Sequence, residues 1–243
     1  MVVLTGTDVY RDIRTSRTAQ RALDAADAIV TLQPRAIDEL PERLRAKARA
    51  ILQSAPARPR PKGRTGGRFE FCVLGHLRHE KDPMRAAYAV RRLPLLPPVR
   101  VTQAGGVLDA RYLEMARREA ERNPRYRYLG ELARGAARRL LVRSDALVLS
   151  SRMEGGANVL GEAIAAGTPV LASRIPGNVG ILGSGYPGLY ALGDTGDLAR
   201  LMRAASTDRA FYDSLRRACA ALAPLMRESA ERAAWKRLLR DVT

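Results

Sequence analysis

The sequence predicts an α/β protein with two Rossmann-like domains, the first of them incomplete in this chain. Three observations support this fold class. Apolar runs of strand length alternate with helical patterns in two separate series along the 243 residues. A stretch rich in proline and glycine, residues 56–67, separates the two series as a linker. Residues 145–173 contain a strand, a glycine loop, a helix and a second strand in direct succession, which is a βαβ unit.

The first series, residues 1–55, predicts strands at 2–5 and 28–32, helices at 16–26 and 34–49, and an apolar end at 51–52. The chain begins inside a strand, and a sheet without its first strands would leave an open edge. We therefore expect upstream sequence to complete this amino-terminal domain.

The turn at residues 5–8 follows the first strand at its carboxyl end, where open α/β sheets bind ligands. The hydroxyls of Thr5 and Thr7, with Arg11 or Arg14, could hold a small anionic ligand there. The alternative is that Asp8 bonds within the turn while the arginines are solvated.

The second series begins at residue 68 and is long enough for a doubly wound parallel domain to residue 225. Its helical tail contains Pro224, which should kink or divide the helix, and residues 226–243 should cross back to the first domain. Cys72 and Cys219 are too few for a disulfide framework, and we expect reduced core thiols. The predicted strands are 69–74, 99–102, 126–129, 145–150, 169–172 and 189–192, and the predicted helices are 83–92, 109–122, 131–142, 158–166, 194–206 and the tail from 208 to 239.

The glycine loop of the βαβ unit is a candidate phosphate site. Gly155 and Gly156 let the backbone approach a ligand closely, and the helix that follows offers amides and a positive dipole end. The expected donors are the amides of residues 157–160, which include Asn158, Val159 and Leu160. Alternatively, the two glycines serve the turn alone.

Glu154 and Glu162 are eight residues apart, on either side of these amides. A carboxylate accepts two hydrogen bonds from the vicinal hydroxyls of a ribose or a sugar. The corner therefore predicts a sugar-nucleotide site, unless Glu162 is simply a solvated helix residue.

The turn from Gly75 to Asp82 lies at the carboxyl end of the first strand of the second series. Arg78 and Lys81 can face the same crevice as the amides and clamp a diphosphate, whose charge grows as it leaves carbon. No Asp-x-Asp pair occurs in the sequence, which agrees with a reaction that needs no metal or other cofactor. His76 could add a proton, although such a histidine is more often structural.

The net charge of +17 permits anionic partners without naming one. Only four of the 42 basic residues are lysines, so 38 are arginines, and they are spread along every predicted helix. A nucleic-acid binder usually concentrates its charge in a stripe with aromatic residues, so we expect no nucleic-acid partner. We also expect no membrane partner and a cytoplasmic location, because no apolar run approaches eighteen residues.

These motifs resemble the carboxyl-terminal domain of GT-B glycosyltransferases of family four. The resemblance rests on the turn from Gly75 to Lys81, on the glutamate pair and on Gly167-Thr168-Pro169, and covers residues 68–243. It implies that Lys81 contacts the donor diphosphate, Glu154 and Gly155 contact the donor sugar, and Glu162 bonds the ribose. It also implies that backbone near Gly130 reads the base.

Within that family, Thr-Gly-Thr-Asp at 5–8, Leu-Gln-Pro at 32–34 and Gly-His-Leu-Arg-x-Glu-Lys-Asp-Pro at 75–83 resemble the selenosugar synthases of selenoneine biosynthesis. This resemblance implies transfer of N-acetylglucosamine from UDP to selenophosphate, a small anionic acceptor that Thr5, Thr7, Arg11 and Arg14 of the amino-terminal, acceptor-side domain would bind. His76 stands where most family members carry an arginine, and Arg78 would supply the lost charge.

Three alternatives stay open at this point: a GT-B transferase with an ordinary alcohol acceptor, an arginine-rich nucleic-acid binder, and a fragment that binds UDP without turnover. The sequence does not fix the transferred sugar, retention or inversion, or the oligomeric state.

Overall fold

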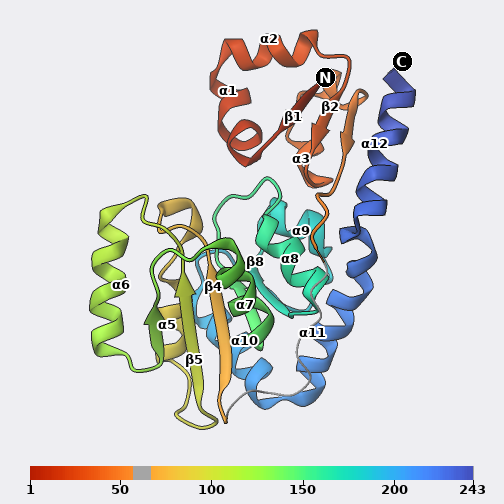
Figure 1. Ribbon diagram of the computed structural model, residues 1–243. Helices are drawn as coiled ribbons and strands as arrows, with labels where there is room; N and C mark the ends of the chain where they lie inside the picture. The colour runs from red at the N-terminus through yellow and green to blue at the C-terminus, as the bar shows by residue number, and fades with distance from the viewer. Residues whose placement is uncertain (57–66, 243) are drawn as a thin grey trace.

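The computed structural model describes residues 1–56 and 67–242, which form two lobes, each built on a parallel sheet (Figure 1). The first lobe has the strand order β1-β2-β3, and the second has the order β6-β5-β4-β7-β8-β9. Most of the predicted linker, residues 57–66, lies outside the described residues.

The first lobe carries its helices between short strands. Its strands are β1 (Val2–Leu4), β2 (Ile29–Thr31) and β3 (Ala48–Ala50). Its helical segments are a π-helical turn (Asp8–Asp12) that continues into α1 (Ile13–Thr15), then α2 (Arg17–Ala25), α3 (Arg35–Asp38) and α4 (Glu42–Arg45).

The single helix predicted at 34–49 is wrong. Pro41 divides it into α3 and α4, because proline lacks an amide hydrogen and disfavours a helical conformation in the residue before it. The last residues, Ala48–Ala50, instead form strand β3 in parallel register with β2, and this places Ala48 in the core of the first lobe.

The predicted turn at residues 5–8 is also different in the structure. The backbone amide and the hydroxyl of Thr5 both donate to Asp8 Oδ2, each at 2.7 Å, and the chain is helical from Gly6 onward. Thr5-x-x-Asp8 is therefore a helix start that resembles a capping box, a signal already present in the sequence. The local bonding of Asp8, stated above as the alternative, is the arrangement found.

The second lobe alternates strand and helix along the chain. Its strands are β4 (Phe69–Leu74), β5 (Val99–Ala104), β6 (Tyr126–Tyr128), β7 (Ala146–Leu149), β8 (Val170–Ser173) and β9 (Leu189–Tyr190). Its helices are η2 (His79–Lys81, a 3-10 helix), α5 (Arg85–Arg91), α6 (Ala110–Arg122), α7 (Arg134–Arg143), α8 (Asn158–Ala166), α9 (Pro176–Leu182) and α10 (Thr195–Thr207).

The order of this sheet fixes where a ligand can bind. From β4 the chain runs outward through β5 to β6, then returns beside β4 as β7 and continues to β9. The strand order therefore reverses between β4 and β7, and a crevice opens at such a point beyond the carboxyl ends of the strands. The predicted doubly wound α/β domain is confirmed.

Helix α9 was not predicted, because Pro176, Gly177 and Gly180 in seven residues argue against a helix. Its glycines permit close approach between segments. A β-carbon at Gly177 would lie 2.0 Å from the carbonyl oxygen of Glu154, and one at Gly180 would lie 1.8 Å from the Gln33 side chain of the first lobe. Helix α9 therefore packs both against the glutamate loop and against the first lobe.

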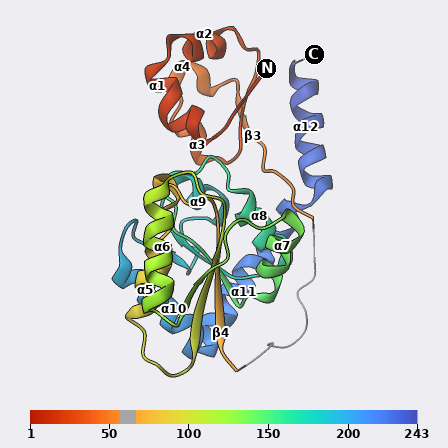
Figure 2. The ribbon, with the colours of Figure 1, turned by 60° about the vertical axis from the view of Figure 1, so that its left-hand side comes forward.

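The carboxyl-terminal helices join the two lobes. Pro224 lies in a 3-10 turn (Ala223–Met226) that separates α11 (Arg209–Leu222) from α12 (Glu228–Val242). Helix α12 runs alongside the first lobe in both views (Figures 1 and 2). Its buried Leu238 packs with Val30 and Ile51 of that lobe.

The two cysteines are fully buried, as expected of core thiols: Cys72 lies in β4 and Cys219 in α11. Among the described residues no helix is long and apolar enough to cross a bilayer.

Candidate functional site

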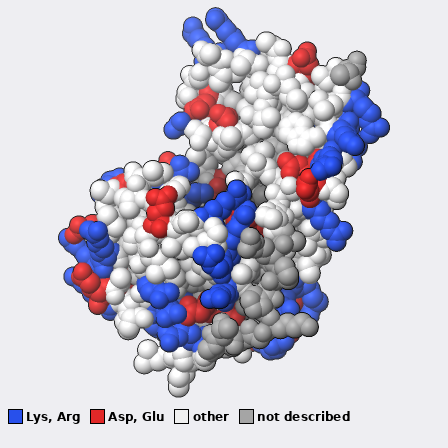
Figure 3. Space-filling view, viewed as in Figure 1, with Lys and Arg blue, Asp and Glu red and all other residues white. Residues whose placement is uncertain are grey.

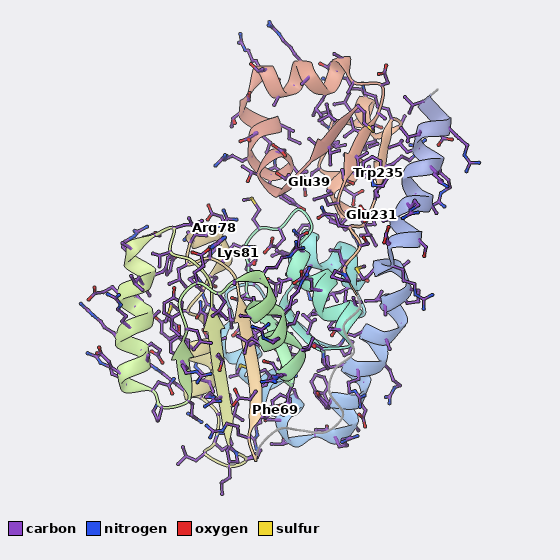
Figure 4. All side chains as sticks on the ribbon, in the orientation of Figure 1. Glu39, Phe69, Arg78, Lys81, Glu231 and Trp235 are labelled. Carbon is purple, nitrogen blue, oxygen red and sulfur yellow. The ribbon has the colours of Figure 1, made fainter. Side chains whose placement is uncertain are left out.

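A cleft of about 390 Å³ lies over the carboxyl ends of β4, β5 and β7. In Figure 4, Phe69 at the start of β4 lies far from the first lobe, whereas Lys81, after the other end of β4, lies next to it. The cleft is lined by Leu74, Gly75, His76, Lys81, Ala104, Gly105, Gly106, Glu131, Leu132, Ala137, Glu154, Gly156, Ala157, Asn158 and Val159.

Lys81 and Glu154 meet across the point where the strand order reverses. Lys81 Nζ lies 2.5 Å from Glu154 Oε1, and the same oxygen accepts a hydrogen bond from Ser151 Oγ, also at 2.5 Å. The side chains are 20% and 9% exposed, so this ion pair is shielded from most of the solvent. Two cooperating donors therefore hold one carboxylate oxygen of Glu154 in place.

Hydrogen bonds to backbone carbonyl oxygens also join the two turns that carry this pair. Ser150 Oγ donates to the carbonyl oxygens of Lys81 and Asp82, at 3.0 and 2.9 Å. The amide of Arg152 donates to the carbonyl oxygen of Glu80 at 2.7 Å. Lys81 and Gly156 accordingly line one cleft, as the predicted diphosphate clamp requires.

The amino-terminal end of α8 forms the wall opposite Lys81. Asn158 and Val159 line the cleft, and their amides belong to the first turn of the helix, where backbone donors lack intrahelical partners. Leu160 was included wrongly among the free amides. Its N–H donates to the carbonyl oxygen of Ala157 at 2.9 Å. Ala157 is the N-cap of α8, so its carbonyl oxygen accepts the first hydrogen bond of the helix.

Glycines bring the backbone of the β5 turn close to the β4 turn. A β-carbon at Gly105 would lie 1.9 Å from the carbonyl oxygen of Gly75. One at Gly106 would lie 3.1 Å from both His76 Nδ1 and Glu131 Oε2, so these two side chains face the same small space. His76 is exposed and lines the cleft.

Arg78, predicted to face the same crevice as Lys81, is not among the lining residues of the cleft. Its Nε lies 3.8 Å from Glu80, two residues further along the chain, and that carboxylate draws the guanidinium away. The structure therefore places Lys81, but not Arg78, beside the amides of α8.

Glu162 lies in the second turn of α8 and contacts α7. Arg138 donates to Glu162 Oε1 from Nε at 3.0 Å and from Nη2 at 2.8 Å. Glu162 lines a second, smaller cavity of about 160 Å³ that shares Gly156, Ala157 and Asn158 with the main cleft. The two glutamates thus flank the start of α8, as their spacing predicted.

The segment expected to read a base follows β6. The carbonyl oxygen of Gly130 accepts from the Gly105 amide at 2.9 Å, and Gly130 has a positive φ of 71°, which favours glycine. The neighbouring Glu131 and Leu132 reach the cleft. Gly130 therefore shapes the cleft wall rather than lining it.

The proposed acceptor residues lie on the first lobe, next to the glutamate loop. A β-carbon at Gly155 would lie 2.1 Å from the Gly6 amide nitrogen, so the two lobes touch there, backbone to backbone. Thr5 is bonded to Asp8, Arg11 to Asp12 at 2.8 Å, and Arg14 to Glu39, so three of the four side chains already have partners within the first lobe. Thr7 is partly buried beside Gly6.

The charge environment of Arg11 includes a residue of the second lobe. The hydrogen bond from Arg11 to Asp12 and the charge of Asp12 raise the pKa of Arg11, and the charge of Glu80 in the second lobe acts in the same direction. In Figure 4, Glu39 of the first lobe and Arg78 and Lys81 of the second lie on facing sides of the gap between the lobes.

Two residues of the site were missed from the sequence. Ser151 stands three residues before Glu154, a spacing at which a hydroxyl can bond the carboxylate, and this signal could have been used. Arg138 is one of four arginines in α7, and nothing in the sequence marks which of them faces Glu162. Within the described residues, no group of three or more His, Cys, Asp or Glu side chains is placed to hold a metal ion.

The fold resembles that of several solved structures. HepE from Anabaena, solved with UDP and glucose, superposes with a TM-score of 0.80 at 17% identity, over 98% of this chain and 71% of that one. TarM from S. aureus, as a G117R mutant solved with Fondaparinux, alpha-GlcNAc-glycerol and UDP, gives a TM-score of 0.76 at 13% identity, over 97% and 50%. Sucrose-phosphate synthase from Thermosynechococcus elongatus gives 0.76 at 18%, over 97% and 64%.

Comparison with curated protein sequences gives no significant match. The sequence profile of the family glycosyl transferases group 1 matches residues 56–222, which is more than half of the chain. Together with the structural likeness, this match confirms the GT-B fold predicted above. The chain belongs to the group 1 family of glycosyl transferases.

Proposed function

We propose that this chain forms the catalytic cleft of a glycosyltransferase that uses a UDP-sugar donor. One observation carries the proposal: Lys81, Glu154 and the first amides of α8 converge on one cleft although they come from distant parts of the sequence. A lysine and backbone amides suit a diphosphate, and the carboxylates suit sugar and ribose hydroxyls. HepE and TarM, which share this fold, hold UDP in their structures.

In the proposed reaction the bond between the anomeric carbon and the diphosphate oxygen breaks, and UDP leaves with the bonding electrons. Lys81 and the amides of Asn158 and Val159 stabilise the charge that develops on the diphosphate. Ser151 holds one oxygen of Glu154, so that the carboxylate can orient the sugar hydroxyls. His76 contributes a hydrogen bond to the diphosphate from the opposite wall. The proposal includes no metal or cofactor.

The proposed acceptor is selenophosphate and the proposed sugar is N-acetylglucosamine. The selenium atom attacks the anomeric carbon, a carbon–selenium bond forms as the carbon–oxygen bond breaks, and no proton has to be removed from the nucleophile. The contact of Gly6 with Gly155 favours a small acceptor, because the lobes already touch beside Glu154. Arg11, with Thr5, Thr7 and Arg14 near it, offers a cation on the acceptor side.

The alternative from a different class of protein is a nucleic-acid binder, which the high positive net charge would also suit. In Figure 3 the Lys and Arg side chains are spread over both lobes and α12, with Asp and Glu side chains among them, and form no continuous stripe on this face. Such a distribution favours the enzyme, because nucleic-acid binding usually uses a concentrated basic surface.

The test is turnover of UDP-N-acetylglucosamine with selenophosphate. The release of UDP measures the rate, and mass spectrometry identifies the product. Thermal unfolding with UDP is measured in parallel, because UDP at 100 times its dissociation constant should add about 2.7 kcal/mol of stability. Product formed only with an alcohol acceptor would overturn the acceptor assignment but keep the transferase. No stabilisation by UDP, together with DNA binding that falls steeply with salt, would overturn the transferase itself.

A further inference from the structure

The carboxylate of Glu162 is held asymmetrically. Both Arg138 hydrogen bonds end on Oε1, and Arg134 Nη2 lies 3.9 Å from the same oxygen. An arginine facing a carboxylate commonly spreads its two bonds over both oxygens. Here Glu162 Oε2 accepts no hydrogen bond from the described part of the chain, so one oxygen is bound and the other is available.

The Glu162 residue borders a cavity that adjoins the main cleft. Arg138 and Glu162 are only 17% and 19% exposed, and both line the cavity of about 160 Å³. Asn158, which lines this cavity and the cleft, is four residues before Glu162 and therefore on the same face of α8. A donor whose diphosphate contacts the first turn of α8 would thus have its ribose within one helical turn of Glu162.

We propose that Arg138 is a positioning residue for nucleotide recognition: it fixes Oε1 of Glu162 so that Oε2 accepts the ribose hydroxyls of the donor. This inference rests on the proposed UDP-sugar function. A glutamate on a helix surface otherwise samples several rotamers, and each must be frozen when a ligand binds. The Arg138 guanidinium holds Glu162 in one rotamer before the ligand binds, so the entropy cost of ordering the side chain is not added to the binding free energy. Arg134 is 80% exposed and adds charge without fixing the geometry.

The alternative is that the pair only joins α7 to α8. The two roles differ in what they do to discrimination between ribose and deoxyribose. A purely structural pair affects stability and weakens all nucleotides alike. A positioning pair affects chiefly the ligand that carries the hydroxyl recognised by Glu162.

The experiment measures the dissociation constants of UDP and 2′-deoxy-UDP by calorimetry for the unmodified chain, Arg138→Gln, Arg138→Lys and Arg139→Gln. Arg139 is the matched control, because it is exposed and adjacent on α7. We expect the unmodified chain and Arg139→Gln to prefer UDP by roughly 10- to 100-fold, the range that a hydrogen bond to a charged group gives. Arg138→Gln should bind UDP about tenfold more weakly, with 2′-deoxy-UDP nearly unchanged, and Arg138→Lys should fall between.

Equal weakening of both nucleotides in Arg138→Gln and Arg138→Lys, or an unchanged preference, would overturn the inference while leaving the proposed function intact. Absence of UDP binding by the unmodified chain would overturn both. Thermal unfolding of each variant shows whether it is folded, and Arg138→Lys, which keeps the charge, supplies the answer if Arg138→Gln is not.

Discussion

The second lobe and the first lobe treat their charged residues differently. Lys81 finds its partner Glu154 in a turn 73 residues away, whereas Arg11 is bonded to the adjacent Asp12 and Thr5 to Asp8 three residues on. The long-range pair depends on the fold of the second lobe, so its geometry is fixed by the sheet. The pairs Thr5–Asp8 and Arg11–Asp12 depend only on one helical segment of the first lobe.

Exposure shows what this difference means for binding. The Lys81 and Glu154 side chains are 20% and 9% exposed, whereas the Arg11 side chain is 66% exposed. An exposed ion pair adds little to stability, so a ligand can replace it at little cost. The proposed donor side is therefore preorganised, and the proposed acceptor side can exchange its partners.

Among the substitutions that test this difference between the lobes, Lys81→Met should have the largest effect on activity. Turnover should fall by about 10²–10³-fold, the loss seen when one donor to a developing charge is removed. The dissociation constant of UDP should change less, because the amides of α8 remain. Steady-state kinetics and calorimetry on the same preparations measure the two effects.

Lys236→Met is the matched control, because Lys236 is exposed on α12 and does not line the cleft. If Lys81→Met and Lys236→Met had equal turnover, Lys81 would not stabilise the leaving group, and the distinction between the two lobes would lose its functional meaning.

The next effect in size concerns the contact between the lobes. In Gly155→Ala the new methyl group would lie 2.1 Å from the Gly6 amide nitrogen, so the lobes must separate or the loop must shift. We expect kcat/KM to fall by about 10- to 100-fold, because a displacement near 1 Å at a reacting centre has effects of this order. Gly185→Ala is the control, since a β-carbon there has open space around it. Unchanged kcat/KM in Gly155→Ala would show that the closed arrangement is not used in turnover.

The donor side was predictable because the carboxyl ends of parallel strands converge on one edge of a sheet. This rule brought Lys81, Glu154 and Gly156 to one cleft without knowledge of any contact. It did not predict that Arg78 turns to Glu80, since a local carboxylate competes with the crevice. Arg138 was hidden because its role depends on how α7 packs on α8, and α7 has arginines on several faces.

The first lobe was harder to predict for a different reason. Its strands have three residues each, and the points where its helices begin and end depend on single residues such as Pro41 and Asp8.

Helix α9 of the second lobe was hidden by its composition. It needs Gly177 and Gly180 for packing, and that tertiary requirement overrides their poor helix propensity.

The third prediction tests how α12 places the first lobe. Glu231 of α12 accepts from the Ser54 amide at 2.7 Å, in the segment that leaves the first lobe, and Trp235 Nε1 lies 3.4 Å from its other oxygen. Burial alone would raise the pKa of Glu231, but the bonds from Ser54 and Trp235 lower it overall. Glu231→Gln should lower Tm at pH 7 by about 2–4 °C, the change that roughly 1 kcal/mol produces in a protein of this size.

The sign of the pH dependence follows from the lowered pKa. The stabilisation by Glu231 is fully present above the pKa of the unfolded state, for which 4.5 is the ordinary value, and is lost as pH falls through the lower pKa of the folded state. The Tm difference between the unmodified chain and Glu231→Gln should therefore shrink below about pH 4.5. A difference that stays constant from pH 7 to pH 3 would show that the carboxylate charge has no part in holding Ser54.

The smallest effect is expected for Arg11→Ala, which tests whether the acceptor side really exchanges its partners. If Arg11 leaves Asp12 to bind an anionic acceptor, its loss should raise the KM for selenophosphate by roughly threefold to tenfold, the value of one exposed charge-assisted contact. The dissociation constant of UDP should not change, because Arg11 lies on the opposite lobe from the α8 amides. Arg17→Ala, another exposed arginine of the first lobe, is the control. If Arg11→Ala changed the dissociation constant of UDP rather than the KM for the acceptor, the first lobe would contribute to donor binding. The assignment of the donor to one lobe and the acceptor to the other would then be wrong.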